Sequence, residues 1–133
     1  MELPIVNHPD YVAKINDDNK FPIKKFGALA EYLLKEDVVK RFYIPTECSI
    51  KTMQTSHSLE YINHIRNKSL DIKLQKKIGF PINDSVVRRS FIATGGTVLA
   101  SKLALDSKLA CNTAGGSHHA TFDYGAGYCV FND

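Results

Sequence analysis

The chain has 133 residues, of which 44% are hydrophobic and 23% are charged, and its net charge is +3. This length suits one small domain or part of a larger one, and the composition is that of an ordinary globular protein. So small a positive charge does not indicate nucleic-acid binding, and no apolar stretch is long enough to span a membrane.

The start of the chain and its cysteines indicate a compartment. Residues 1–4 lack the basic start and the long apolar stretch of a signal peptide, and the three cysteines form no CxxC motif. We therefore expect a cytoplasmic, reducing location, with no membrane and no nucleic acid as partner. The basic pairs at 24–25, 76–77 and 88–89 indicate solvated helix faces.

Short elements are expected in the first part of the chain. The apolar run at residues 3–6 predicts a strand at the edge of a sheet, and the polar residues 7–20 predict a loop. Phe21 and Pro22 open a predicted helix that ends at residues 35–37, and residues 42–44 predict a brief strand. The apolar residues of that helix recur at helical spacing: Phe26, Leu29, Ala30, Leu33 and Leu34.

Two more helices follow. Residues 58–66 predict a short helix with Leu59, Ile62 and Ile65 on its apolar face. A long helix is expected to begin at Pro81 to Asp84, with Asn83 or Asp84 as its N-cap, and to run to about Leu105. Its apolar stripe consists of Ile92, Gly95, Gly96, Leu99 and Leu103. The two glycines each cost about 1 kcal/mol relative to alanine. They indicate either very close packing against a neighbour or a break in the helix.

The last predicted element is a buried strand at residues 109–114, which are short and mostly apolar. The order of helix, strand and glycine loop indicates an α/β fold with a parallel sheet. In such sheets the ligand crevice lies beyond the carboxyl ends of the strands. His118 and His119 fall at that place.

The adjacent histidines are the main candidates for chemistry. Gly115 and Gly116 precede them and permit backbone conformations that turn side chains into a crevice. One imidazole is able to act as general base toward water while the other holds a hydrogen bond or a positive charge. The alternative is a loop with two solvated histidines. In the next glycine turn, Tyr128 either walls an apolar channel or packs in the core.

The other candidate side chains are weaker. Cys129 next to a histidine is a possible nucleophile, but its apolar neighbours favour a buried, inert thiol. Cys111 lies in an apolar run and is expected to be buried as a free thiol. His57 is expected either to hydrogen-bond locally or to face the crevice, whereas His8 and His64 are expected at the surface.

Two stretches carry a family resemblance: GGSHHA at 115–120 and GYCVFND at 127–133. They resemble the core signature of the zinc-dependent histone deacetylase superfamily. The chain is most similar to the class IV branch and to its bacterial acetoin-utilization-type relatives. Weaker upstream motifs fall in the expected order, at residues 8–11, 21–26, 57–62, 88–90 and 94–97.

The resemblance implies a fold and a set of roles. The fold is the three-layer α/β arrangement of arginases and deacetylases, with a mainly parallel central sheet that is incomplete at its C-terminal side. His119 is implied to be the general base, His118 its electrostatic and hydrogen-bonding partner, and Gly127 and Tyr128 the channel residues that contact the substrate. The implied reaction is hydrolysis of an N-acyl amide, in an acyl-lysine or an acylated polyamine, with Zn²⁺ as cofactor.

The zinc ligands of the family, an Asp-x-His pair and a later Asp, come after the Asn-Asp pair, here Asn132 and Asp133. Residues 1–133 therefore resemble the N-terminal part of one deacetylase-like domain, without metal ligands of their own. We expect this chain to be inactive alone and to self-associate through an exposed sheet edge. The alternatives are a non-catalytic α/β binding module or a decayed fragment of the enzyme and, more distantly, a cysteine hydrolase built on Cys129.

Overall fold

The computed structural model describes residues 2–133. Two short strands, β1 (Ile5–Val6) and β2 (Cys111–Asn112), pair in parallel. On the other side of β1, Val6 forms a parallel bridge with Tyr43. The Tyr43 amide donates to the carbonyl oxygen of Ile5, and the Asn7 amide donates to that of Tyr43. The predicted first strand is thus confirmed, but its prediction as an edge strand is wrong, because β1 lies between β2 and Tyr43.

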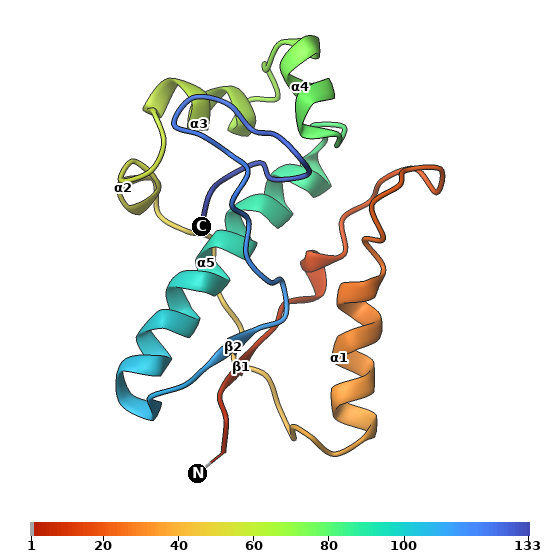
Figure 1. Ribbon diagram of the computed structural model, residues 1–133, viewed down its shortest axis with the longest axis vertical. Helices are drawn as coiled ribbons and strands as arrows, with labels where there is room; N and C mark the ends of the chain where they lie inside the picture. The colour runs from red at the N-terminus through yellow and green to blue at the C-terminus, as the bar shows by residue number, and fades with distance from the viewer. Residues whose placement is uncertain (1) are drawn as a thin grey trace.

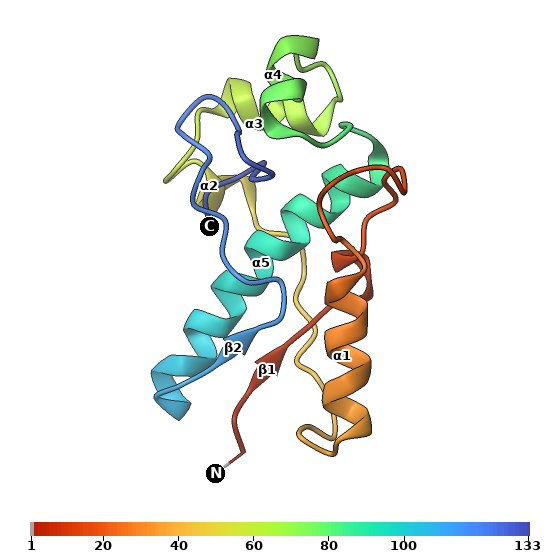
Figure 2. The same cartoon turned by 45° about the vertical axis from the view of Figure 1, so that its right-hand side comes forward.

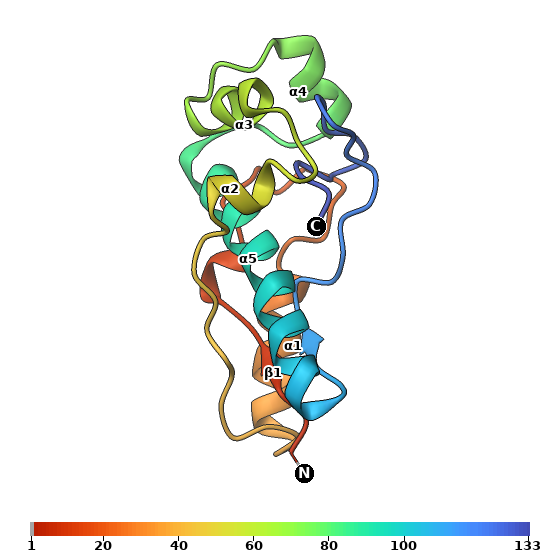
Figure 3. The same cartoon turned by 90° about the vertical axis from the view of Figure 1, so that its left-hand side faces the viewer.

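Helices form a larger part of the described residues than the strands do. They are η1, a 3-10 helix (Pro9–Tyr11), and the α-helices α1 (Lys25–Lys35), α2 (Ile50–Met53), α3 (Leu59–Arg66), α4 (Ile72–Ile78) and α5 (Asp84–Ser107). Helices α1 and α5 lie on opposite sides of the strand pair (Figures 1 and 2). Helices α2, α3 and α4 gather with the C-terminal segment at the end of the molecule remote from the N-terminus (Figure 3). No helix of the described residues is both long and apolar enough to cross a membrane.

Helix α5 is unbroken through its two glycines. A Cβ atom at Gly95 would lie 1.9 Å from the carbonyl oxygen of Thr46, and one at Gly96 would lie 2.1 Å from the Tyr11 hydroxyl. Close packing therefore explains the glycines, and the alternative of a break is wrong. The helix begins where the sequence predicts, with Asn83 as N-cap accepting a hydrogen bond from the Val86 amide at 2.9 Å.

Two predicted helices differ from the structure in detail. Helix α1 begins at Lys25, later than predicted, because the Asn19 side chain caps the Phe21 amide and holds the intervening residues in turns. Helix α3 begins at its Ser58 cap as predicted, and Ile62 and Ile65 are buried. Its third core residue is Tyr61, whereas Leu59 is exposed.

Strand β2 is parallel as predicted, but it is not buried. Leu109, just before the strand, is 63% exposed, and Cys111 is exposed as a free thiol. The predicted burial of Cys111 is therefore wrong within residues 2–133. The reason is that β2 pairs with β1 on one side only. In the last turn of α5, Leu105 is 77% exposed as well.

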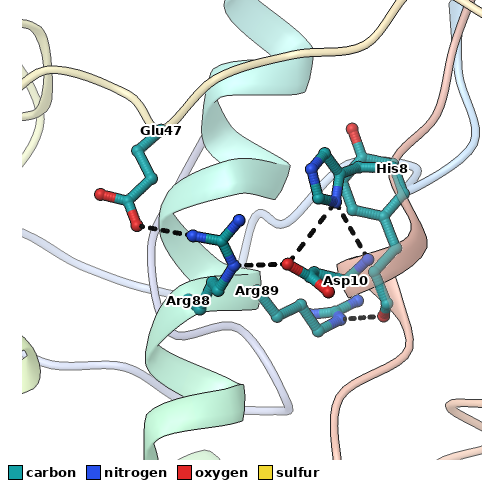
Figure 4. A network of polar contacts seen from close by, with 6 residues as sticks. His8, Asp10, Glu47, Arg88 and Arg89 are labelled. Atoms are coloured by element: carbon teal, nitrogen blue, oxygen red, sulfur yellow. Dashed lines mark hydrogen bonds and ion pairs between the residues drawn. The ribbon is translucent and has the colours of Figure 1, made fainter.

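An ion-pair network joins η1 to the start of α5. Arg88 pairs with Asp10 of η1 and reaches Glu47 at 3.7 Å (Figure 4). Its neighbour Arg89 donates instead from Nε to the carbonyl oxygen of Tyr11 at 2.8 Å. The exposed pairs contribute little stability, so the buried contacts of Tyr11 and Arg89 hold η1 against the helix.

Candidate active site

A cavity of about 460 Å³ lies beyond the carboxyl end of β2. The loop after β2 forms one side, the N-terminal part of α1 with its preceding turn forms another, and the C-terminal glycine turn forms the third. Arg89 of α5 also lines it. The cavity brings together the four residues for which the sequence predicts a role: His118, His119, Gly127 and Tyr128.

The two histidines lie next to each other at the open side of the cavity. Their ring centroids are 4.2 Å apart, and both residues are exposed. Gly115 has a φ of 69°, in the left-handed region, so a residue with a side chain would be strained there. Within residues 2–133, neither histidine forms an ion pair. The arrangement leaves both imidazoles able to exchange protons with a bound molecule.

The wall opposite His118 is made by Gly127 and Tyr128. Gly127 has a φ of 54°, and a Cβ atom there would lie 3.1 Å from the His119 ring. Tyr128 packs against Phe21 and Phe80, with ring centroids 5.0 and 5.3 Å away, and these two rings also contact each other at 5.1 Å. The Tyr128 ring therefore does what both sequence interpretations described, since it lines the cavity and also packs against the core.

The backbone of this wall is held by α4. The Tyr128 amide donates to the carbonyl oxygen of Ile78 at 2.7 Å, and the Gly127 amide donates to that of Lys77 at 3.2 Å. Gly79, in the left-handed conformation after α4, would collide with the Tyr128 ring if it carried a Cβ atom. Sequence periodicity missed α4, although Asp71 and Gly79 supply its N-cap and its left-handed C-cap.

Arg89 is a cavity residue that the sequence interpretation missed. It is 8% exposed, so the expectation of a solvated helix face is wrong for this member of the 88–89 pair. No carboxylate within residues 2–133 pairs with it, and its guanidinium lies over the Phe26 ring at 4.8 Å. Burial lowers the pKa of Arg89 to about 10, so the group remains charged near neutral pH. Its position three residues before Ile92 on the stripe of α5 was the signal available in the sequence.

The remaining cysteine and histidine candidates do not complete a second catalytic set. Cys129 is buried, as its neighbours predict, and its sulfur has no hydrogen bond within the described part of the chain. A cysteine nucleophile needs a base within hydrogen-bond reach, so the cysteine hydrolase is not supported. His8 caps η1, and His64 bonds Ser69 at the surface. His57 is buried away from the cavity and contacts Asn132, 75 residues along the chain, so neither expectation for it is right.

A catalytic zinc ion needs three protein ligands as a rule. Within residues 2–133, no three histidine, cysteine, aspartate or glutamate side chains come together as a metal-binding group. The described residues therefore do not fit a zinc ion on their own, and no step of the chemistry is assigned to one.

Comparison with known proteins identifies the family. A model of the histone deacetylase domain matches residues 20–133. The chain belongs to the histone deacetylase family. An uncharacterized protein of the cyanobacterium Picosynechococcus is 41% identical over 135 residues, a match that covers 100% of this chain and 45% of that protein. Histone deacetylase 2 of Arabidopsis thaliana is 28% identical over 129 residues and is covered to 31%.

The fold agrees with this assignment. The crystal structure of a histone deacetylase homolog in complex with the ligand SAHA superposes with a TM-score of 0.78 at 21% identity, covering 99% of this chain and 39% of that one. The arginase/deacetylase fold predicted from the sequence is confirmed to that extent. The chain spans less than half the length of these relatives.

Proposed function

We propose that this chain supplies the paired-histidine side of an active site that hydrolyses the amide of an N-acyl-lysine or an acylated polyamine. One observation carries the proposal beyond family membership. His118 and His119, with rings 4.2 Å apart, share a cavity with Gly127 and Tyr128.

The roles follow from the chemistry of imidazole. A neutral imidazole accepts a proton near neutral pH, so His119 acts as general base toward an attacking water. His118, beside it, acts as its electrostatic and hydrogen-bonding partner, and His119 returns the proton that it took from water to the departing amine. Gly127 leaves room next to the His119 ring, and the Tyr128 ring offers a flat apolar wall to the alkyl chain of a lysine.

The charge inside the cavity suits the products. Hydrolysis of an N-acyl amide converts a neutral group into a carboxylate and an amine. Arg89 places a buried cation on the same cavity, without a carboxylate partner among residues 2–133. A guanidinium binds carboxylates in a planar, two-point geometry. The carboxylate product is therefore better stabilised in the cavity than the neutral substrate.

Zinc belongs to this proposal only for the whole enzyme. The family likeness suggests that the metal ligands lie on polypeptide that follows Asp133, and the whole protein would use the metal to polarise the amide carbonyl. We propose a cytoplasmic location for it, with an acylated small molecule or protein as partner and without nucleic acid or membrane.

The test joins residues 1–133 to the part of the cyanobacterial relative that lies C-terminal to its matched region. We expect this chimera to release acetate from an acetyl-lysine peptide. His119→Ala should lower the rate by about 10²- to 10⁴-fold, the range for loss of a general base. His64→Ala, on the surface of α3, serves as the matched control. An active chimera whose rate is unchanged by His119→Ala contradicts the proposal.

The wall of the cavity is tested by two glycine variants. Gly127→Ala places a methyl group against the His119 ring in a strained backbone conformation, so acetyl-lysine should no longer bind. Gly116→Ala is the matched control, because its Cβ atom would meet nothing closer than 3.9 Å. Equal binding by both variants would show that the substrate lies elsewhere.

A second candidate is a binding module without turnover. The formed cavity is the observation in its favour, because binding needs no metal ligand. Under this alternative, acetyl-lysine amide shifts the Gly127 and Tyr128 amide resonances of the isolated chain, while the chimera releases no acetate.

A further inference from the structure

The last two residues hold the loop that carries the paired histidines. The Asn132 side-chain amide donates to the carbonyl oxygen of Ala120 at 2.9 Å and to that of His118 at 3.3 Å. These carbonyls lie one residue before and one residue after His119. A single side chain therefore fixes the backbone on both sides of the proposed base.

A second tie runs through Asp133. One carboxylate oxygen accepts from the Ser117 amide at 2.6 Å, and the other accepts from the Thr97 hydroxyl of α5 at 2.5 Å. The Asp133 amide donates back to the Ser117 carbonyl oxygen at 3.2 Å. The start of the histidine loop is thus linked to the long helix.

His57 fixes the backbone of Asn132 from the core. Its Nε2 atom accepts the Asn132 backbone N–H at 2.9 Å. Only a ring nitrogen without a proton accepts a hydrogen bond, so His57 is neutral here with its proton on Nδ1. The ring is 2% exposed and packs against Tyr61 and Phe131, with centroids 5.5 and 5.3 Å away.

The surroundings of His57 favour this neutral form. Burial lowers the pKa of His57, and backbone contacts with Phe122, Thr121 and Asn132 only partly oppose it. Nδ1 has no hydrogen-bond partner at normal distance within the described residues. The Nε2 contact is therefore the one full hydrogen bond of a ring that lies in the core, outside the cavity.

We propose that His57 is a positioning residue for the paired-histidine loop, acting through Asn132. The importance of His119 rests on the proposed function, whereas the contacts of His57 and Asn132 are independent of it. Without the His57 acceptor, the backbone N–H of Asn132 loses its partner, and the backbone from which the Asn132 side chain extends is no longer held in place. The hydrogen bonds of that side chain then no longer fix the backbone around His119. A ring that serves only to fill the core would have no such effect.

The test uses the whole chain with ¹⁵N-labelled histidine and long-range ¹H–¹⁵N spectra of the imidazole rings. In the unsubstituted chain we expect His57 as the Nδ1–H tautomer, and an Nε2–H tautomer overturns the proposal without any variant. His57→Phe keeps a ring but removes the acceptor, and should shift or broaden the His118 and His119 signals. His57→Gln, which places an amide oxygen near the Nε2 position, should restore them. His64→Phe is the matched control.

Coupling to Asn132 separates positioning from general packing. Asn132→Ala should disturb the same two rings, and adding His57→Phe to it should cause no further change. An additional shift in the double variant, or unchanged rings in His57→Phe, contradicts the mechanism. These spectra report the loop whether or not a substrate binds or turns over, so their outcome is independent of the chimera experiment.

Discussion

Gly95 gives the sharpest test of how α5 is packed. Replacing a mid-helix glycine with alanine normally stabilises a helix by about 1 kcal/mol. Here the new Cβ atom would lie 1.9 Å from the Thr46 carbonyl oxygen and 3.0 Å from the Cys48 amide nitrogen. Both are backbone atoms, so a side-chain rotation cannot relieve the contact. The Thr46 segment must move by about 1 Å or more to restore normal van der Waals contact.

The cost of this movement exceeds the gain in helix propensity. Overpacking of a filled site typically costs about 1–3 kcal/mol. The Cys48 amide donates to the Phe91 carbonyl oxygen at 3.0 Å, and displacing that hydrogen bond adds about 1 kcal/mol. Subtracting about 1 kcal/mol for helix propensity, we expect Gly95→Ala to lower the free energy of unfolding by about 1–3 kcal/mol.

Urea unfolding followed by circular dichroism measures this difference, through the midpoint at constant m-value. Gly27→Ala in α1 is the matched control, because its Cβ atom would meet only the end of the Val12 side chain, at 3.2 Å. That variant should be neutral or slightly more stable. A midpoint for Gly95→Ala equal to or above that of the unsubstituted chain would refute the packing argument.

Three further predictions concern acid, thiols and assembly. Because burial lowers the pKa of His57 from 6.5, the unfolded state binds more protons as pH falls below about 6.5, so the contribution of His57 to stability should decrease there and be constant above it. A urea midpoint series at several pH values should show a smaller decrease for His57→Gln, and an equal decrease contradicts the assignment. In the native chain, a thiol reagent should modify Cys111 rapidly and the other two cysteines only on unfolding, because Cys111 is exposed and they are buried. Cys111→Ser should abolish the fast phase of modification. A fast phase that persists in this variant would contradict the assignment of exposure. The chain should also associate through the open side of β2, because Leu105 and Leu109 are 77% and 63% exposed. Sedimentation velocity should show concentration-dependent association that Leu109→Lys reduces. A single monomeric species at high concentration would exclude this association.

Local signals in the sequence predicted two of the capped helices, α3 and α5, whereas α2 and α4 were missed although Ser49 and Asp71 cap them. Ser58 and Asn83 both cap the helices that they precede, since each side chain accepts an amide of the first turn. The two glycines of α5 also carried correct information about close packing. These features depend on residues near one another in sequence, which is why they could be predicted.

Burial and strand position could not be predicted in the same way. The sequence predicts a brief strand at residues 42–44, of which the structure keeps only the bridge at Tyr43, but local pattern does not show that this segment pairs with residues 3–6. Residues 109–114 look buried because they are apolar, yet their exposure depends on what covers the outer side of β2. Arg89 was assigned to the surface for its charge, although its place on the stripe of α5 puts it over three aromatic rings.

In the candidate site, too, some features follow from local sequence and others depend on distant segments. Its reacting groups lie in one continuous stretch, residues 113–129, and the motif within it revealed His118 and His119. That stretch is fixed by distant segments: Asn132 anchored by His57, Asp133 anchored by Thr97, and the carbonyls at the end of α4. The motif therefore directed attention to two imidazoles, while the residues that fix their loop are recognised only through contacts. Changes at His57, at Thr97 or at the end of α4 should consequently alter the histidine loop or the glycine turn even where they leave the motif intact.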